Sequence, residues 1–169
     1  MLEKEIKILL WIQNTVRNAN LNKYWYGLTV IGNYWIWHSI NIGLVLNHST
    51  RHIGYIVWSA VGVEVVVVHI VLKKFTNQPR PFEINKEIVP IGKLPKDRSF
   101  PSGHTCIAFT CAILYWTYLP MWFALIMTII ACLIAFSRMY LGVHYPRDVF
   151  GGIVFAILID VVILSMYTI

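Results

Sequence analysis

Five long apolar segments dominate this sequence and limit what it can fold into. They cover approximately residues 24–47, 53–73, 103–119, 121–141 and 147–168. A helix rises about 1.5 Å per residue and the bilayer core is about 30 Å thick, so about 20 residues cross it. The 169-residue chain is 57% hydrophobic and only 13% charged, which leaves too little polar surface for a water-soluble domain. We therefore predict an all-α integral membrane helix bundle of about five transmembrane helices, forming one domain over residues 1–169.

The N-terminal segment has a different pattern. Over residues 3–19, apolar side chains such as Leu9 and Ile12 alternate with polar ones such as Lys7 and Arg17. A mixed helix of this kind is typical of the membrane interface, so we predict an interfacial helix within residues 1–22. The apolar run at 8–12 is too short for a signal peptide and has no small-residue cleavage site after it, so we expect no cleavable signal.

One long polar stretch, residues 74–102, interrupts the apolar segments. It contains basic residues and the prolines Pro79, Pro81, Pro90, Pro95 and Pro101. Loops of this length are uncommon in compact proteins and are usually functional, so we predict an active-site loop. Its apolar residues indicate that it caps the site or dips into the interface. Its lysines either attract an anionic head group or only solvate the surface.

The net charge of +6 points to an anionic partner. The basic residues lie between apolar segments and do not form a soluble patch with exposed aromatics, so nucleic acid is not expected. Anionic lipid head groups or a phosphorylated substrate fit better. The sequence does not indicate an oligomeric state.

Three polar clusters fall at predicted helix ends. They are Lys73 with Arg80-Pro81, then Pro101-Ser102-Gly103-His104, then Ser137-Arg138 with His144 and Asp148. Alternating the direction of the five spans brings all three clusters to one face of the membrane, together with the long loop. Taken singly, a basic residue at a helix end is usually an interface anchor, and a Ser-Gly step is usually a helix cap. Three ordered clusters on one face favour a functional site.

These clusters have the chemistry of a phosphate site. Arg80 and Arg138 can each grip two phosphate oxygens, and Lys73 adds a point charge. Ser102 and Gly103 lie at a helix start, where free N–H groups favour an anion.

The two histidines of the clusters suit phosphoryl transfer. Pro146 suits a helix start, so His144 and Asp148 flank it at a spacing of four residues. The carboxylate can then hold one ring nitrogen of His144 and leave the other free to attack phosphorus. His104 is available to protonate the leaving oxygen.

In this order, the clusters resemble the three-part signature of the type 2 phosphatidic acid phosphatase superfamily, which also includes vanadium haloperoxidases and glucose-6-phosphatase. The resemblance covers residues 73–148 without a departure at a diagnostic position. It implies that His144 is the nucleophile forming a phosphohistidine, Asp148 its orienting partner and His104 the general acid. It also implies that phosphate is held by Lys73, Arg80, Ser102, Gly103 and Arg138. No cofactor or metal is expected, since no carboxylate cluster could supply a magnesium site.

The resemblance to small bacterial members implies a lipid substrate. We expect a polyprenyl pyrophosphate such as undecaprenyl pyrophosphate, hydrolysed to the monophosphate for recycling in cell-wall synthesis. Phosphatidylglycerophosphate and phosphatidic acid are the alternatives within the same chemistry. A transporter or structural membrane protein with a basic interfacial patch is the alternative of another class.

The side of the membrane is the point on which two signals disagree. Of the fourteen Lys and Arg residues, only Arg51 falls on the face opposite the clusters, which favours a cytoplasmic site. The resemblance favours an extracytoplasmic site in a bacterial plasma membrane, and this is the arrangement we expect.

Several residues within the spans lie outside the signature. Ionisable groups are costly at membrane depth, and Glu64, Asp160, His38 and His69 are of this kind. For Glu64 we favour a neutral or hydrogen-bonded structural carboxyl over a substrate contact. Asp160 is placed nearer the opposite interface, and His69 is a possible supporting residue near Lys73. The three cysteines, Cys106, Cys111 and Cys132, have no metal-type spacing and are expected to be small buried hydrophobic side chains.

Overall fold

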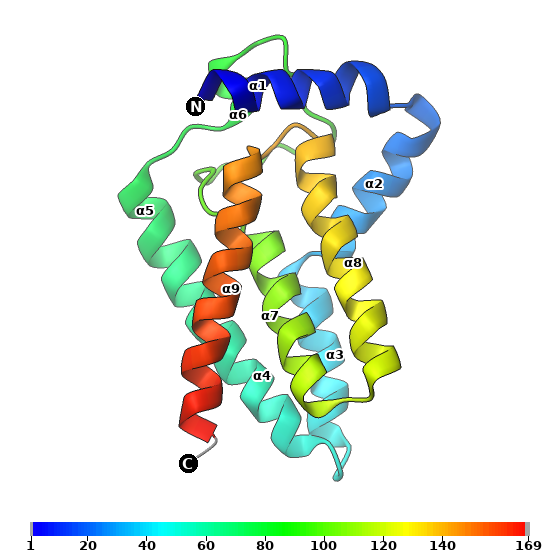
Figure 1. Cartoon of the computed structure of the whole chain (residues 1–169), viewed down its shortest axis with the longest axis vertical. Helices are drawn as coiled ribbons and strands as arrows, with labels where there is room; N and C mark the ends of the chain where they lie inside the picture. The colour runs from blue at the N-terminus through cyan, green and yellow to red at the C-terminus, as the bar shows by residue number, and fades with distance from the viewer. Residues whose placement is uncertain (1, 168–169) are drawn as a thin grey trace.

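The structure, a computed structural model, describes residues 2–167, and within that range it contains helices and no strand. The elements are α1 (Leu2–Trp11), η1 (Ile12–Val16), α2 (Ala19–Ile31), α3 (Tyr34–Leu46), α4 (Arg51–Glu64), η2 (Val65–Leu72), α5 (Lys73–Thr76), α6 (Pro81–Ile84), α7 (Gly103–Tyr118), α8 (Met121–Tyr140) and α9 (Pro146–Tyr167). The long helices run side by side along one axis, and α1 lies across one end of them (Figure 1). The all-α bundle predicted from the sequence is confirmed.

Among residues 2–167, three helical segments are long and apolar enough to cross a membrane by themselves: Arg51–Ile84, Met121–Tyr140 and Pro146–Tyr167. At two other spans, the structure differs from the single long helix that was predicted. The third, α7, has 16 residues, and the first consists of α2 and α3 in sequence. The bundle therefore has the expected arrangement, with one span shorter and one span broken.

The break in the first span lies at Gly32 and Asn33, where a single helix over 24–47 was expected. A Cβ on Gly32 would lie 2.7 Å from Ile134 Cγ2 and 3.1 Å from His104 Cδ2, so the backbone there is packed directly on α8 and α7. Asn33 adopts extended backbone and precedes the first residue of α3. The span bends at the small residue because this close approach admits no side chain.

The N-terminal interfacial segment is shorter than predicted. Its helix ends at Val16, and α2 begins at Ala19 because the Asn18 side chain caps it by accepting a hydrogen bond from the Asn20 N–H at 2.9 Å. Leu9 and Ile12 face the bundle end and are buried, and the helix lies crosswise to the spans (Figure 1).

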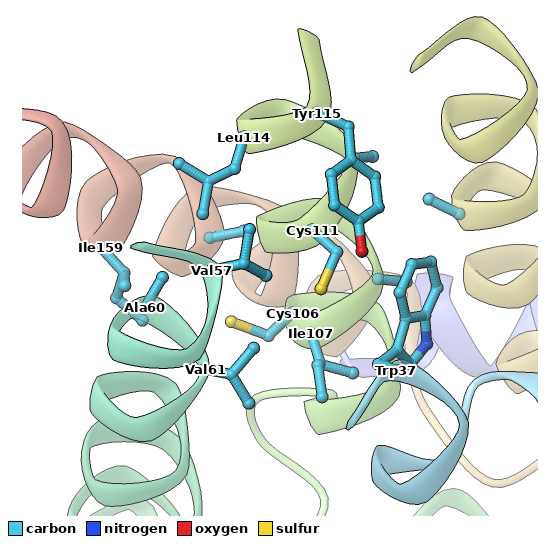
Figure 2. Close-up of a cluster of buried hydrophobic side chains, with 14 of the residues drawn as sticks. Trp37, Val57, Ala60, Val61, Cys106, Ile107, Cys111, Leu114, Tyr115 and Ile159 are labelled. Carbon is cyan, nitrogen blue, oxygen red and sulfur yellow. The ribbon is translucent and has the colours of Figure 1, made fainter. Parts of the chain in front are cut away.

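Helix α7 forms the centre of the bundle and is buried on nearly every side, as expected for a helix without a polar face. Figure 2 shows its Cys106, Ile107 and Cys111 between Val57 and Val61 of α4 on one side and Trp37 of α3 on the other. The prediction of buried cysteines is confirmed for Cys106 and Cys111. It is wrong for Cys132, which is exposed on the outer face of α8.

The loop between α5 and α7 contains a short helix and is hydrogen-bonded to the N-terminal segment. The preceding helix continues to Thr76 and ends at Asn77, whose φ of 45° is left-handed. The loop then forms the short helix α6. Gln13 of η1 ties the loop to the N-terminal segment, donating to the Glu87 carbonyl at 2.9 Å and accepting from the Val89 N–H at 2.9 Å. The loop thus lies fixed at the bundle end between the spans and the crosswise helix.

Candidate active site

All eight predicted site residues lie at the end of the bundle that α1 covers. Lys73 follows η2, Arg80 precedes α6, and Ser102, Gly103 and His104 open α7. Arg138 lies in the last turn of α8, and His144 and Asp148 flank the first residue of α9. The spans run alternately up and down, so these segments meet although they are up to 75 residues apart in the sequence (Figure 1).

The turn between α8 and α9 fixes the position of His144. The Val143 N–H bonds to the Arg138 carbonyl at 3.2 Å, and the Gly142 N–H bonds to the Met139 carbonyl at 2.9 Å. Gly142 has a φ of 70°, which completes a Schellman ending that glycine adopts without strain. The His144 N–H also lies 3.3 Å from the Arg138 carbonyl. The end of one helix therefore places the predicted nucleophile beside a predicted phosphate ligand.

The two ring nitrogens of His144 have different partners. Nδ1 lies 3.4 Å from Asp148 Oδ2, and Nε2 lies 3.2 Å from Arg80 Nη1. A guanidinium has only N–H donors, so Nε2 must accept from it through its lone pair. The ring proton then resides on Nδ1, facing the carboxylate. His144 is thus held as the neutral tautomer whose free lone pair points toward the cationic groups.

The charge state of His144 agrees with this tautomer. Burial lowers its pKa well below the ordinary value, and the positive charges of Arg80, Arg138 and Lys73 lower it further. The ring is therefore neutral at neutral pH and available as a nucleophile.

Asp148 is itself held rigidly. Its Oδ2 accepts from the Ser99 hydroxyl and from the Tyr145 N–H, the latter at 2.9 Å. The side chain is fully buried. Pro146 opens α9 between the two residues, so the helix start itself sets the spacing from His144 to Asp148.

Lys73 and Arg80 share one carboxylate, that of Asp97. Lys73 Nζ contacts Asp97 Oδ2, and Arg80 Nη2 lies 2.8 Å from Asp97 Oδ1. Burial acts to raise the pKa of Asp97, but Lys73 and then Arg80 outweigh it and lower this pKa to about 2. Arg80 also donates to the Val143 carbonyl at 2.7 Å, which orients its guanidinium toward His144. The carboxylate of Asp97 therefore lies where two cations would meet phosphate oxygens.

Arg138 and His104 line the main cleft, a cavity of about 580 Å³. Arg138 donates to the Thr29 hydroxyl, and His104 Nε2 lies 3.0 Å from Asn33 Oδ1. The cleft is also lined by Tyr26, Val30, Lys93, Leu94, Pro95 and Lys96. The lining of the cleft thus combines cationic and apolar side chains, which suits a phosphate joined to a lipid.

Ser102 and Gly103 lie at the base of the site. The Ser102 N–H bonds to the Asp148 carbonyl at 3.0 Å, and its hydroxyl accepts from Thr105 at 3.0 Å. A Cβ on Gly103 would lie 2.5 Å from His69 Nε2, so only glycine admits that ring. These two residues join the start of α7 to α9 and to η2. Ser102 does not line either of the two cavities that His104 lines.

Comparison with known proteins agrees with this geometry. Residues 53–168, more than half of the chain, match the PAP2 superfamily. The chain belongs to this superfamily. An undecaprenyl-diphosphatase from Sulfolobus acidocaldarius is 32% identical over 134 residues, and undecaprenyl-diphosphatase BcrC from Bacillus subtilis is 32% identical over 113 residues. These alignments span 79% and 66% of this chain, but only 65% and 55% of those relatives.

Two solved structures match nearly the whole chain. LpxE from Aquifex aeolicus is 30% identical, with a TM-score of 0.84, and the match covers 94% of this chain and 93% of that one. The transmembrane PAP2 type phosphatidylglycerolphosphate phosphatase from Bacillus subtilis has a TM-score of 0.81 over 98% of this chain and 85% of that one. At 23% identity, the second match concerns the fold alone.

Four residues of this PAP2 site were not identified from the sequence: Thr29, Asn33, Asp97 and Ser99. Each contacts one of the predicted residues. A Gly-Asn step inside an apolar span was a signal for Asn33, since such a step marks a helix break. Asp97 could have been identified as an acidic residue among the basic residues of the loop. No sequence pattern indicated that Thr29 or Ser99 belongs to the site.

The other ionisable residues of the spans lie apart from His144. His38 packs edge-on against Tyr34, with ring centroids 4.0 Å apart. Asp160 and Glu64 are buried, and neither carboxyl has a hydrogen-bond partner within residues 2–167, contrary to the hydrogen-bonded role considered for Glu64. Within the same residues, no cluster of three or more His, Cys, Asp or Glu could hold a metal ion.

Proposed function

We propose that this protein is a membrane lipid phosphatase that hydrolyses a polyprenyl pyrophosphate such as undecaprenyl pyrophosphate through a phosphohistidine on His144. The observation that carries the proposal is the pair of partners of the two ring nitrogens of His144. Its Nδ1 faces Asp148, and its Nε2 lone pair faces Arg80. A neutral imidazole among cations has the properties of a nucleophile for an anionic phosphoryl group.

In the first half of the reaction, the terminal phosphate enters among Lys73, Arg80 and Arg138. Phosphate oxygens take over the two cations that Asp97 contacts in the structure. His144 Nε2 attacks phosphorus, and Asp148 stabilises the positive charge that develops on the ring. The P–O bond breaks, and His104 gives its proton to the leaving lipid phosphate. The fixed cations stabilise charge on the transferring group, which is the main source of catalysis in such sites.

In the second half, water attacks the phosphohistidine from the position that the leaving oxygen vacated. His104, now neutral, accepts one water proton. The P–N bond breaks, its electron pair returns to His144, and inorganic phosphate leaves. The protons therefore balance within one cycle.

Two observations support a lipid pyrophosphate as the substrate. Relatives from Sulfolobus acidocaldarius and Bacillus subtilis are named undecaprenyl-diphosphatases. The cleft also combines the cation of Arg138 and two loop lysines with apolar side chains, among them Leu94. Phosphatidylglycerophosphate and phosphatidic acid are phosphate monoesters, from which the same phosphoryl transfer would release an alcohol instead of a lipid phosphate, and they form the comparison set.

A substrate panel tests this proposal. Purified protein should release phosphate from undecaprenyl pyrophosphate faster than from the two glycerolipid phosphates, with EDTA present throughout. His144→Ala should abolish release, and Asp160→Asn, a change remote from both cavities that His104 lines, should retain it. Loss of activity in EDTA, or full activity in His144→Ala, would contradict the mechanism.

We also propose that the active site faces the extracytoplasmic side of a bacterial plasma membrane. The family resemblance supports this orientation. The basic residues at the site end oppose it, but Lys73, Arg80 and Arg138 are required by the chemistry and give no information on topology.

A further inference from the structure

A second, smaller cavity lies beside His104. Its volume is about 160 Å³, and its polar lining comes from Asn33, Glu64, His69 and His104. His104 and Asn33 also line the main cleft, and their side chains are 3.0 Å apart. This hydrogen-bonded pair therefore stands between the cleft and the smaller cavity, which we call the chamber.

Glu64 is the most unusual residue of the chamber. Its side chain is only 1% exposed, and neither carboxyl oxygen has a hydrogen-bond partner in the part of the chain that the structure describes. The nearest cationic candidate is His69, whose Nε2 lies 3.8 Å from Glu64 Oε1, beyond hydrogen-bond distance. A buried carboxyl without partners is costly, and such groups are usually satisfied by ordered water.

The backbone around Glu64 is arranged to form this chamber. Glu64 ends α4, and the next residues, Val65–Leu72, form a π-helical stretch, a geometry often found at functional sites. His69 lies in this stretch and packs against Gly103, the residue next to His104. The π-helical stretch and the lack of a side chain on Gly103 thus place the His69 imidazole at the wall of the chamber.

The dimensions and chemistry of the chamber suit water. Its volume is equivalent to about five water molecules at about 30 Å³ each. The carboxyl, the two imidazoles and the Asn33 amide offer polar partners to such water.

We propose that Glu64 and His69 hold the water that hydrolyses the phosphohistidine and deliver it to His104. This inference rests on the proposed function. The attacking water must occupy the position left by the leaving oxygen, next to His104, and His104 must remove one of its protons. The chamber lies against that residue. Glu64 and His69 are then positioning residues for the second half of the reaction and have no part in the first.

Rapid-quench kinetics with ³²P-labelled lipid pyrophosphate tests this role, with an alkaline quench that preserves phosphohistidine. In Glu64→Leu, the phosphoenzyme should form at nearly the rate of the unsubstituted protein and break down about tenfold more slowly, so it accumulates. Glu64→Gln keeps two hydrogen-bonding groups and should recover part of the breakdown rate. His69→Leu alters the neighbouring, half-exposed side chain, so it tests the chamber should Glu64→Leu fold poorly.

Asp160→Leu is the matched control, since Asp160 is an equally buried carboxyl without partners that lines neither cavity. It should leave the breakdown rate unchanged. The inference is overturned if the chamber variants break down the phosphoenzyme at the unsubstituted rate, or if formation and breakdown fall together. The proposed function itself fails, and this inference with it, if the unsubstituted protein forms no phosphoenzyme.

Discussion

His144 shows how a single side chain acquires its reactivity from its surroundings. Asp148 fixes the proton on Nδ1, and Arg80 can approach Nε2 only when that nitrogen carries a lone pair. Burial and three cations keep the ring neutral. The groups proposed to bind phosphate therefore also keep the proposed nucleophile deprotonated.

The lowered pKa of His144 predicts the acid limb of the pH profile. A base is active above its pKa, so the nucleophile is lost only as the pH falls through this lowered value. The single-turnover rate of phosphoenzyme formation should therefore not decrease as the pH falls from about 7.5 to about 6, below the ordinary histidine pKa of about 6.5. A loss of rate centred at or above pH 6.5, and unchanged with substrates of different phosphate pKa, would contradict a neutral His144.

Asp97 provides a second prediction at the same scale. Its carboxylate is ionised at neutral pH and competes with phosphate for Lys73 and Arg80. The side chain is 47% exposed, so solvent screens these ion pairs and limits the effect. Asp97→Asn should therefore tighten competitive inhibition by vanadate or inorganic phosphate by about tenfold.

The matched control for Asp97 is Glu87→Gln in the same loop, an exposed acid that hydrogen-bonds through its backbone N–H and carbonyl. It should leave the inhibition constant unchanged. If Asp97→Asn weakened inhibition, its carboxylate would be supporting the two cations instead of competing for them.

At the scale of elements, helix ends determine where the functional groups lie. The Schellman ending of α8 joins Arg138 to His144, and the proline start of α9 joins His144 to Asp148. The break between α2 and α3 brings Asn33 to His104. Where a helix ends or breaks, its polar backbone groups and side chains are available for other contacts. Several helix ends and the break between α2 and α3 come together at this end of the bundle.

Gly142→Ala tests the helix ending. An alanine at a φ of 70° is strained, and its Cβ would lie 2.9 Å from Arg17 Nη2. We expect a loss of about 1–2 kcal/mol in stability and a lower rate, since the His144 backbone would shift. Gly43→Ala, a helical position with open space, should be neutral or slightly stabilising. Thermal unfolding in detergent measures both, and equal effects would contradict a special role for Gly142.

At the scale of the whole molecule, the pattern of apolar segments and three polar clusters predicted much of the structure. Side-chain chemistry restricts which residue types can bind phosphate, so Lys73, Arg80, Arg138, His104 and His144 were identifiable without coordinates. Asp97 and Thr29 were not, because their roles depend on how the loop and α2 pack against the bundle. Cys132 was misplaced because apolar sequence does not distinguish a lipid-facing residue from a core residue.

Membrane orientation is a property of the whole molecule, and labelling can test it. In a Cys132→Ala background, single cysteines replace Lys86 in the exposed loop at the site end and Ser49 at the opposite end. A membrane-impermeant maleimide added to intact cells should label residue 86 and leave residue 49 unlabelled. The reverse pattern would place the active site in the cytoplasm, as the distribution of basic residues favours.

The most direct measurement of the central claim is the site of covalent phosphorylation. The protein is incubated briefly with lipid pyrophosphate, quenched in alkali, digested and examined by mass spectrometry. The account predicts phosphate on His144, absent in His144→Ala and carried by no other residue. Rapid turnover of substrate without phosphate on His144, or phosphate on a different side chain, would contradict it.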